Sequence, residues 1–478
     1  MAYTVSAADA YVRAHRSEVD PAYRPAFHLC APVGWINDPN GFCFYKGKYH
    51  LFAQFHPYDS VWGPMHWAHW TSEDLTHWEE QPTALAPDSP FDDMGCFSGT
   101  ALEHDGRLVI LYTGVHQDPD GSWIQEQCLA WSDDGITFTK YAGNPVIGRA
   151  LLPEDGDPRD FRDPKLIRTE DGWRAACANK GKNGGRVLTF RSKDLTRWEY
   201  EGVLMDGIGE MAECPDYMTM DDDPALIASV YRLGRQEEGF RAADHDVIYA
   251  TGEEQDGALV PRVTASVDFG PDFYAPQTLL TPDGRRVMIG WMGSCGGNCP
   301  THVLGHRWQG VLTAPRELVA MSWRIYQRPA REVEALFEDA LKVPYLAVRG
   351  ETRLQGARAR RYELKTQFTV PYGETGEIRL LESGEEYLAL RWSPETRVFE
   401  LDRSRCGDPA DGVTRAKLTY GGESIALTVL ADSCVVEVLV NDGLIAMTAL
   451  VYPKGSADGI SFAGRALVSD LMLRTFKE

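Results

Sequence analysis

Short apolar runs that alternate with turn residues repeat at a fixed spacing along the first half of the chain. Each copy has a Ser, an Asp two residues later, a Thr, and an aromatic residue six positions after the Ser. The copies are TSEDLTHW at 71–78, WSDDGITF at 131–138 and RSKDLTRW at 191–198. The Ser residues lie at positions 72, 132 and 192, so both intervals are 60 residues long.

A second repeated element, a turn glycine followed by an apolar or alternating run, precedes each of the three copies. These elements are YKGKYHLF at 45–52, HDGRLVILYTG at 104–114 and EDGWRAACANK at 170–180, and the element occurs again as DGRRVMIGW at 283–291. Together the two elements have the pattern of a β-meander. One meander cannot bury both of its faces, but several packed radially as a β-propeller can. At this period residues 25–328 hold five blades. The alternative, a large β-sandwich with coincidental similarity, does not explain the equal spacing.

The rest of the chain has other patterns. PAREVEALFEDAL at 329–341 has apolar residues at helical spacing, which predicts a linking helix within residues 329–344. Residues 345–478 are short β-rich runs separated by Gly, Asp and Asn, with a hairpin turn NDG at 441–443, as in a β-sandwich. Residues 1–24 are expected to form a lead-in helix. The predicted fold class is therefore all-β, a five-bladed propeller followed by a sandwich.

Charge and composition narrow the function classes. The formal net charge is −22, which argues against nucleic acid and anionic membranes as partners. The N-terminus lacks a basic start with an apolar core, so we expect a cytoplasmic protein. The ten cysteines are then expected to be reduced thiols. Cys295 and Cys299 lack the companion ligands of a metal site, so neither a metal nor another cofactor is expected.

Three acidic residues occupy similar positions in the repeat. Asp38 lies in NDPNG, Asp163 in FRDPKL and Glu213 in AECPDY, and a Pro follows each acid directly or after one residue. Pro stiffens the local backbone, which suits a catalytic group. A single Asp-Pro is more simply a turn, and others occur at 118–119, 157–158, 223–224 and 408–409. Three acids in phase with blades that share one central channel favour a functional site.

Carboxylates and aromatic residues together suit glycosyl transfer. Two carboxyl groups flank the glycosidic bond, where one attacks the anomeric carbon and the other protonates the leaving oxygen. A third carboxylate nearby would supply like charge and hold sugar hydroxyls. The chain also has 13 Trp and 20 Tyr residues, some of which could offer apolar faces to sugar rings.

These motifs resemble glycoside hydrolase family 32, the β-fructofuranosidases, which include invertases and sucrose-6-phosphate hydrolases. The resemblance runs from RPAFH at 24–28 to the end of the chain, and WINDPNG, FRDP and ECPD are its most specific motifs. Further matches are WGPMHWAHWTSEDLTHW at 62–78, CFSGTA at 96–101, WQGVLTAPREL at 308–318 and ADSCVVEVLVNDG at 431–443. The fold of that family is a five-bladed propeller followed by a β-sandwich, in agreement with the repeat count.

The resemblance implies a role for each acid. Asp38 would be the nucleophile, Glu213 the general acid and then base, and Asp163 the stabiliser of the transition state. The mechanism would be double displacement with retention, through a fructosyl-enzyme. The implied substrate-binding residues are Asn37, Gln54, Trp62, Phe97, Ser98, Arg162 and Trp291, with Tyr274 near the acid/base. None of the histidines His50, His56, His66, His69 and His77 is expected to be catalytic.

Several alternatives stay open at the level of sequence. The substrate would be sucrose, sucrose 6-phosphate or short fructo-oligosaccharides. The same site could transfer fructose to a sugar, or the propeller could bind carbohydrate without catalysis. A phosphate at position 6 of the glucose unit would require positively charged side chains at the rim of the pocket, and Arg235, Arg241 and His245 are candidates. The sandwich could stabilise the propeller, narrow the cleft or pair subunits into a homo-oligomer.

Overall fold

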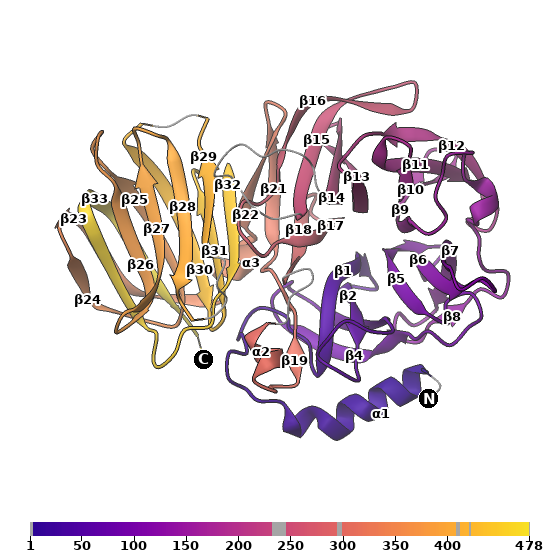
Figure 1. Cartoon of the computed structure of the whole chain (residues 1–478), viewed down its shortest axis with the longest axis horizontal. Coiled ribbons are helices and arrows are strands. Elements are labelled where there is room, and N and C mark those ends of the chain that lie inside the picture. The colour runs from indigo at the N-terminus through magenta and orange to yellow at the C-terminus, as the bar shows by residue number, and fades with distance from the viewer. Residues whose placement is uncertain (1–2, 232–244, 294–298, 408–411, 420–421, 478) are drawn as a thin grey trace.

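The computed structural model describes residues 3–231, 245–293, 299–407, 412–419 and 422–477. Five radial β-sheets surround a central axis, and a layered β-sandwich packs beside the fifth sheet (Figure 1). The predicted all-β class, the five-bladed propeller and the C-terminal sandwich are confirmed. No helix among the described residues is both long enough and apolar enough to cross a membrane.

Each blade starts with the strand nearest the axis. Blade I contains β1 (Gly34–Tyr45), β2 (Lys48–His56), β3 (His66–Ser72) and β4 (Trp78–Leu85). Blade II contains β5 (Gly95–His104), β6 (Arg107–Gln117), β7 (Trp123–Ser132) and β8 (Thr139–Lys140). Blade III contains β9 (Phe161–Thr169), β10 (Gly172–Gly181), β11 (Gly184–Ser192) and β12 (Trp198–Met205).

Blades IV and V complete the ring. Blade IV contains β13 (Met211–Met220), β14 (Asp223–Tyr231), β15 (His245–Gln255) and β16 (Ala258–Ser266). Blade V contains β17 (Tyr274–Leu280), β18 (Arg286–Met292), β20 (Val311–Leu312), β21 (Arg316–Met321) and β22 (Arg324–Pro329). The inner strands β1, β5, β9, β13 and β17 contact one another in order, and β17 contacts β1. In addition, β19 (Trp308–Gln309) pairs in parallel with β1, which ties the end of the propeller to its first blade.

The 60-residue repeat is the turn between the third and fourth strands of a blade. In each copy the Asp side chain accepts two backbone amide hydrogen bonds of 2.8–2.9 Å from the turn that follows it, at Asp74, Asp134 and Asp194. The next residue has φ of 68°, 84° and 67° at Leu75, Gly135 and Leu195. The shared Ser-x-Asp-x-x pattern therefore encodes one left-handed turn three times.

The helical regions are short. The lead-in segment forms α1 (Val5–His15), which packs on β4, and the 3-10 helix η1 (Arg16–Glu18). Two further short helices are η2 (Arg149–Leu151) and α2 (Pro300–Val303). The predicted linking helix over 329–341 is mostly wrong, because α3 spans only Arg331–Glu334 and β23 begins at Phe337. Residues 337–349 pair with the long strand β33, and these tertiary hydrogen bonds override the local helical pattern.

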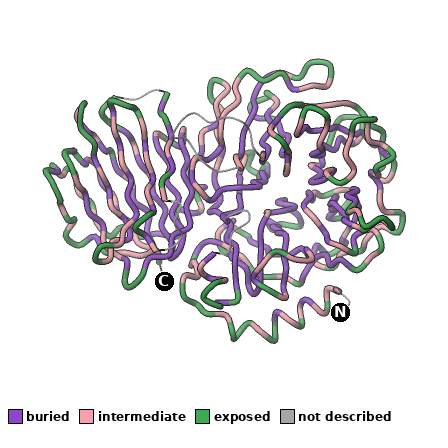
Figure 2. Tube along the Cα trace, viewed as in Figure 1, coloured by how far each residue is buried: buried purple, intermediate pink, exposed green. Residues whose placement is uncertain are grey.

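The sandwich consists of two layers that share one strand. Its strands are β23 (Phe337–Arg349), β24 (Thr352–Arg358), β25 (Arg361–Thr369), β26 (Gly376–Ser383), β27 (Glu386–Ser393), β28 (Val398–Arg405), β29 (Val413–Lys417), β30 (Ser424–Asp432), β31 (Val435–Val440), β32 (Ile445–Leu450) and β33 (Gly459–Phe476). The first half of β33 pairs with β26 and its second half with β25. The interior of the sandwich and the inner strands of the propeller are buried (Figure 2). The predicted hairpin turn at 441–443 joins β31 to β32.

Candidate active site

Every inner strand of the propeller breaks its pairing with the second strand, at two points in blade I and at one point in each of the other blades. One β-bulge per blade falls between Ile36 and Pro39, Phe97 and Gly99, Arg162 and Lys165, Glu213 and Asp216, and Tyr274 and Gln277. A bulge re-aims side chains and is common next to active sites. The five bulges therefore gather functional side chains from five distant parts of the sequence around the propeller axis.

Aligning the five motifs on the Pro of each bulge, or on Gly99 in blade II, shows that the three predicted carboxylates are not equivalent. The residue directly before that Pro or Gly is Asp38, Ser98, Asp163, Cys214 or Ala275 in successive blades. The residue one position earlier is Asn37, Phe97, Arg162, Glu213 or Tyr274. Asp38 and Asp163 thus share one position, whereas Glu213 lies one residue earlier in its strand. This offset places Glu213 in a different environment from the two aspartates.

The bulged backbone is unusual in three consecutive blades. Asp163, Cys214 and Ala275 have φ values of 58°, 46° and 48°, and each directly precedes a proline. Left-handed backbone is uncommon for residues other than Gly, and a following Pro restricts the residue before it further. Such strain is typical of functional sites, where the surrounding structure holds it in place. In blade II the site has Gly99 after Ser98, and a Cβ there would lie 2.2 Å from the carbonyl oxygen of Leu111.

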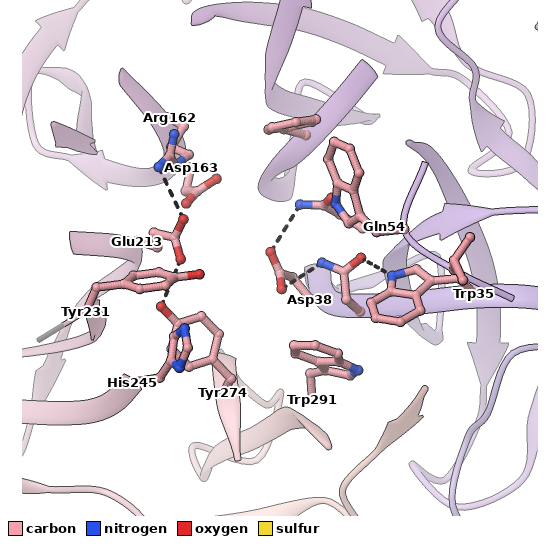
Figure 3. Close-up of a pocket in the computed structure, with 14 residues that line it drawn as sticks. Trp35, Asp38, Gln54, Arg162, Asp163, Glu213, Tyr231, His245, Tyr274 and Trp291 are labelled. Carbon is pink, nitrogen blue, oxygen red and sulfur yellow. Dashed lines mark hydrogen bonds and ion pairs between the residues drawn. The ribbon is translucent and has the colours of Figure 1, made fainter. Parts of the chain in front are cut away.

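The bulges line a cavity of about 690 Å³, within the range of about 300–1,000 Å³ that is usual for small-molecule sites (Figure 3). Its described lining consists of Trp35, Asn37, Asp38, Gln54, Val61, Trp62, Phe97, Arg162, Asp163, Glu213, Tyr231, His245, Tyr274 and Trp291. All three predicted catalytic residues and all predicted binding residues except Ser98 are in this set. Ser98 lies directly behind it and contacts Asp38.

Asp38 is held by donors from both sides. The Asn37 amide donates to Oδ1 at 2.9 Å, and Asn37 is itself oriented by the Trp35 indole N–H at 2.8 Å. The Ser98 hydroxyl donates to Oδ2 at 2.7 Å and Gln54 Nε2 at 3.0 Å. Burial raises the pKa of Asp38, the hydrogen bonds from Ser98 and Asn37 oppose that rise, and the charge of Glu213 adds to it. The carboxylate therefore has a defined orientation beside a like charge.

Asp163 is the more deeply perturbed carboxylate. Its Oδ2 accepts a 2.9 Å hydrogen bond from the backbone amide of Cys214. Burial raises the pKa of Asp163 to about 7, opposed by the neighbouring charge of Arg162 and reinforced by the charges of Glu213 and Asp38. Near neutral pH this group is therefore poised between its acid and its carboxylate form.

Glu213 contacts the opposite wall of the cavity. The Tyr274 hydroxyl donates to Oε2 at 2.8 Å, and Arg162 Nη2 lies 3.2 Å from Oε1 (Figure 3). Arg162 is fixed in turn by Gln125 at 2.8 Å and by Asp160 at 3.2 Å. Glu213 thus has a neutral donor on one oxygen and a guanidinium on the other. This is an arrangement in which a carboxyl group can exchange a proton with a ligand without changing position.

Sequence reasoning missed four participants. Cys214 lies 3.6 Å from Asp38 Oδ2 and from Asp163 Oδ2, and burial together with the charges of these aspartates raises its pKa well above normal. It therefore stays a thiol between two carboxylates. Trp35, Val61 and Tyr231 line the cavity. Only Cys214 and Trp35 lie inside the quoted motifs, where Cys214 directly follows Glu213 and Trp35 stands two residues before Asn37.

Other singled-out residues divide into those inside and those outside the cavity. His245, proposed only for phosphate, lines it beside Tyr231 and Tyr274, with ring centroids 4.2 and 5.7 Å away. Arg235, Arg241 and Cys295 lie outside the described residues. His50, His56, His66, His69 and His77 are not part of the described lining. His50 and His69 instead contact each other at 3.0 Å, and burial lowers the pKa of both.

Comparison with known proteins identifies the family. The model of the glycosyl hydrolases family 32 N-terminal domain matches residues 28–329, and that of the family 32 C-terminal domain matches residues 332–471. The chain is 34% identical to sucrose-6-phosphate hydrolase of Escherichia coli, over 94% of this chain and 93% of the relative. It is 35% identical to raffinose invertase of Escherichia coli, over 93% and 94%.

Solved structures agree with this result. A mutant of the Bombyx mori family 32 β-fructofuranosidase in complex with sucrose superposes with a TM-score of 0.85 at 31% identity, over 99% of this chain and 98% of the other. The sucrose-6-phosphate hydrolase from Lactobacillus gasseri has a TM-score of 0.86 at 25% identity, over 98% and 96%. Together with the two family models, these similarities show that the chain belongs to glycosyl hydrolase family 32 and is a β-fructofuranosidase.

Proposed function

We propose that this enzyme releases fructose from sucrose, sucrose 6-phosphate or short fructo-oligosaccharides by double displacement, with retention of configuration. The observation that carries the proposal is the convergence of Asp38, Asp163 and Glu213 on one cavity, each with a different set of partners. The sucrose complex of the Bombyx mori enzyme and the two bacterial relatives support a fructoside of this size as substrate.

In the first step, an oxygen of Asp38 attacks C2 of the fructosyl unit. The bond from C2 to the glycosidic oxygen breaks, and Glu213 gives its proton to that oxygen, so the leaving sugar departs as an alcohol. A fructosyl ester of Asp38 forms. The donors Asn37, Ser98 and Gln54 keep the attacking carboxylate in one orientation, which lowers the entropic part of the barrier.

In the second step, the ionised Glu213 takes a proton from water, and the water oxygen attacks C2. The ester bond breaks, Asp38 returns to its carboxylate form, and fructose is released. Burial raises the pKa of Asp38, and the charge of Glu213 adds to that rise, so the two carboxyl groups are coupled electrostatically. The proposed cycle requires Glu213 to carry the proton in the first step and to be ionised in the second, while Asp38 is esterified.

Asp163 would hold hydroxyl groups of the fructosyl ring. With a pKa raised to about 7 it can accept or donate a hydrogen bond to a sugar hydroxyl, and as an anion it favours the positive charge that develops at the anomeric centre. Arg162 and His245 are the basic side chains among the described lining residues, and Arg162 already pairs with Asp160 and Glu213. His245 is therefore the candidate among them to bind a phosphate on the leaving sugar.

The proposal is tested by incubating the purified chain with sucrose, sucrose 6-phosphate, a fructotriose and inulin, with and without methanol. We expect fructose from at least one of the first three, and methyl β-D-fructofuranoside as the methanol product, because two inversions restore the original configuration. The Glu213→Ala variant is the control. Formation of the α-methyl fructoside would overturn retention, and fructosylated sugars without free fructose would show a transferase instead.

A further inference from the structure

The segment that leads into the inner strand of blade V is attached to the sandwich. Residues 267–273 connect β16 to β17 and lie along β32, the last strand of its sheet. The Phe269 amide donates to the carbonyl of Ala446 at 2.7 Å, and the Asp272 amide donates to that of Thr448 at 3.2 Å. An uncovered strand edge exposes unpaired amides and carbonyls. The segment covers this edge and so ties the propeller to the sandwich.

The attachment is close. A Cβ on Gly270 would lie 2.0 Å from the backbone nitrogen of Thr448, so only glycine permits this approach. Next to it, Phe269 packs against the hydrophobic core of the sandwich. Residues 269 and 270 therefore pack on the sandwich, although the chain continues directly into the propeller.

A buried ion pair holds the far end of the segment. Asp272 Oδ2 accepts a 2.8 Å hydrogen bond from the Leu450 amide and forms an ion pair with Arg403 of β28. Arg403 also donates to the Leu450 carbonyl at 2.8 Å. Asp272 is 2% exposed and Arg403 5% exposed. Removing one member of such a pair leaves a buried charge without its counter-ion and displaces the chain that carries it.

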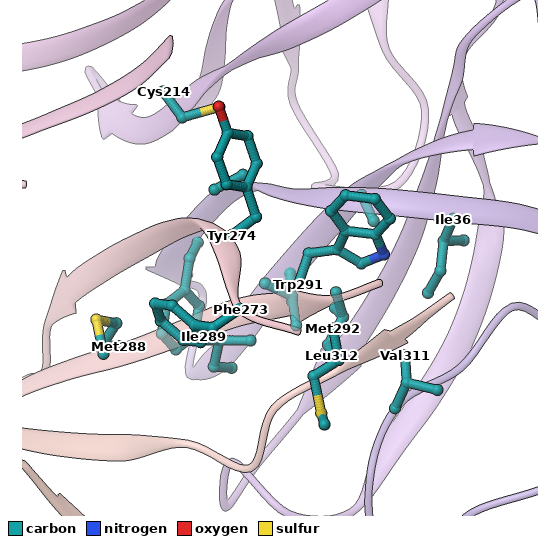
Figure 4. Close-up of a cluster of buried hydrophobic side chains, with 14 of the residues drawn as sticks. Ile36, Cys214, Phe273, Tyr274, Met288, Ile289, Trp291, Met292, Val311 and Leu312 are labelled. Atoms are coloured by element: carbon teal, nitrogen blue, oxygen red, sulfur yellow. The ribbon is translucent and has the colours of Figure 1, made fainter. Parts of the chain in front are cut away.

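Asp272 is two residues from a side chain that contacts the acid/base. Tyr274 begins β17, and its hydroxyl donates to Glu213 Oε2 at 2.8 Å. The intervening Phe273 and Tyr274 itself lie in one buried cluster with Trp291, the β18 partner of Tyr274 (Figure 4). With a single packed residue between them, the backbone of Asp272 and that of Tyr274 cannot move independently.

We infer that the sandwich positions the acid/base of the propeller: the Arg403–Asp272 pair anchors residues 272–274, and Tyr274 in turn holds Glu213. The inference rests on the role proposed above for Glu213. Arg403 and Asp272 are positioning residues, because neither is among the described residues that line the cavity. The sandwich then contributes to catalysis by positioning Glu213 for proton transfer to the leaving group.

The test compares two leaving groups. Sucrose needs a proton on its leaving oxygen, whereas para-nitrophenyl β-D-fructofuranoside releases a nitrophenolate that does not. Displacing Glu213 should therefore slow sucrose more. We expect the ratio of kcat/KM for the nitrophenyl substrate to kcat/KM for sucrose to rise about tenfold in Arg403→Gln and Asp272→Asn, the loss expected when one hydrogen bond to the acid is misplaced. Tyr274→Phe should raise the ratio similarly, and Glu213→Gln more.

Arg391→Gln is the matched control. Arg391 pairs with Glu377, Glu400 and Asp402 in the same sandwich sheet and is not part of the attachment. It should lower the melting temperature and leave the ratio unchanged. If a single variant does not fold, the double variant Asp272→Asn with Arg403→Gln removes both charges together. An unchanged ratio in the folded interface variants, while Tyr274→Phe raises it, would overturn the inference. An unchanged ratio in Glu213→Gln would instead remove the acid role itself.

Discussion

Two regions of the molecule bury carboxylates, and their surroundings shift the pKa of Glu437 and that of Asp163 in opposite directions. At the interface of propeller and sandwich, burial acts to raise the pKa of Glu437, but the charge of Arg316 and the hydrogen bond and charge of His28 lower it to about 2. His28 lies 2.8 Å from Glu437 and 3.0 Å from Asp432, and although burial acts to lower its pKa, these carboxylates raise it to about 9. In the cavity, burial raises the pKa of Asp163 to about 7.

The difference lies in the counter-charges rather than in burial. At the interface Glu437 has both Arg316 and His28 within hydrogen-bonding distance, and its lowered pKa makes the ionised form the stable one. The described lining of the cavity has one guanidinium, that of Arg162, and three carboxyl groups, so acidic groups outnumber guanidinium groups around the substrate. The interface therefore stabilises the contact between the two domains. The buried negative charge of the cavity instead lowers stability, and in the proposed mechanism it would favour the positive charge that develops on the sugar.

The largest expected effect is the loss of activity when a carboxylate of the cavity is removed. Asp38→Ala and Glu213→Ala should each lower kcat/KM on sucrose by about 10³-fold or more, because in the proposed mechanism each removes a group that takes part in forming or breaking a bond. Their melting temperatures should equal or exceed that of the parent, since a charge repulsion is relieved. Asp223→Asn, in an exposed Asp-Pro outside the cavity, is the control and should keep full activity. Near-normal turnover in a folded Asp38→Ala protein would refute its assignment.

The next effect is on stability at the interface. Glu437→Gln should lower the free energy of unfolding by about 3–5 kcal/mol, because Arg316 and His28 lose their shared carboxylate inside a buried network. Urea or thermal melts at pH 7 measure this. The exposed pair of Glu79 with Lys48 is the contrast, and Glu79→Gln should cost at most about 1 kcal/mol. Equal losses in the two variants would contradict the comparison.

A third prediction concerns pH. Asp163 has its pKa raised from 3.8 to about 7 in the folded protein, so the folded state binds its proton more tightly than the unfolded state. Stability from this group is present below pH 4 and falls as pH rises to 7, by at most about 1.4 kcal/mol per pH unit. Asp163→Asn should flatten the melting temperature over this range and stabilise the protein at pH 7. A parent whose stability rises steadily from pH 4 to 7, unchanged by the substitution, would speak against it.

The smallest expected effect is a change in KM when an exposed aromatic residue at the cavity is removed. Trp62 is 47% exposed at the cavity and Tyr345 is 68% exposed on the sandwich. Trp62→Ala should raise KM for sucrose about fivefold, corresponding to about 1 kcal/mol of lost contact with a sugar ring. Tyr345→Ala should leave kcat and KM unchanged. Initial-rate kinetics decide between them, and a KM unaffected by Trp62→Ala would place the sugar elsewhere in the cavity.

The turns and bulges of this protein can be predicted from its sequence, because each depends on residues that lie close together in the chain. The turn that begins with Ser72 is encoded within eight residues by an Asp acceptor and a left-handed position, and so are the turns at Ser132 and Ser192. A proline within the bulge follows each of the three acids, directly after Asp38 and Asp163 and after one residue at Glu213. Local chemistry also explains why the turn-glycine element is not evident in the sequence of blade IV. The turn of its first hairpin has Asp221 and Asp222, at φ of 48° and 71°, in place of a glycine.

The sequence by itself determined the number of blades, the order of the domains and the three carboxylates, because turns and bulges depend on residues close together in the chain. Only the tertiary structure decided which side chains meet. Closing the ring placed Cys214 between Asp38 and Asp163, and pairing with β33 made residues 337–349 a strand. Contacts between residues far apart in sequence carry no short pattern. Their energies depend on which partners the closed fold brings together, as the Arg403–Asp272 pair illustrates.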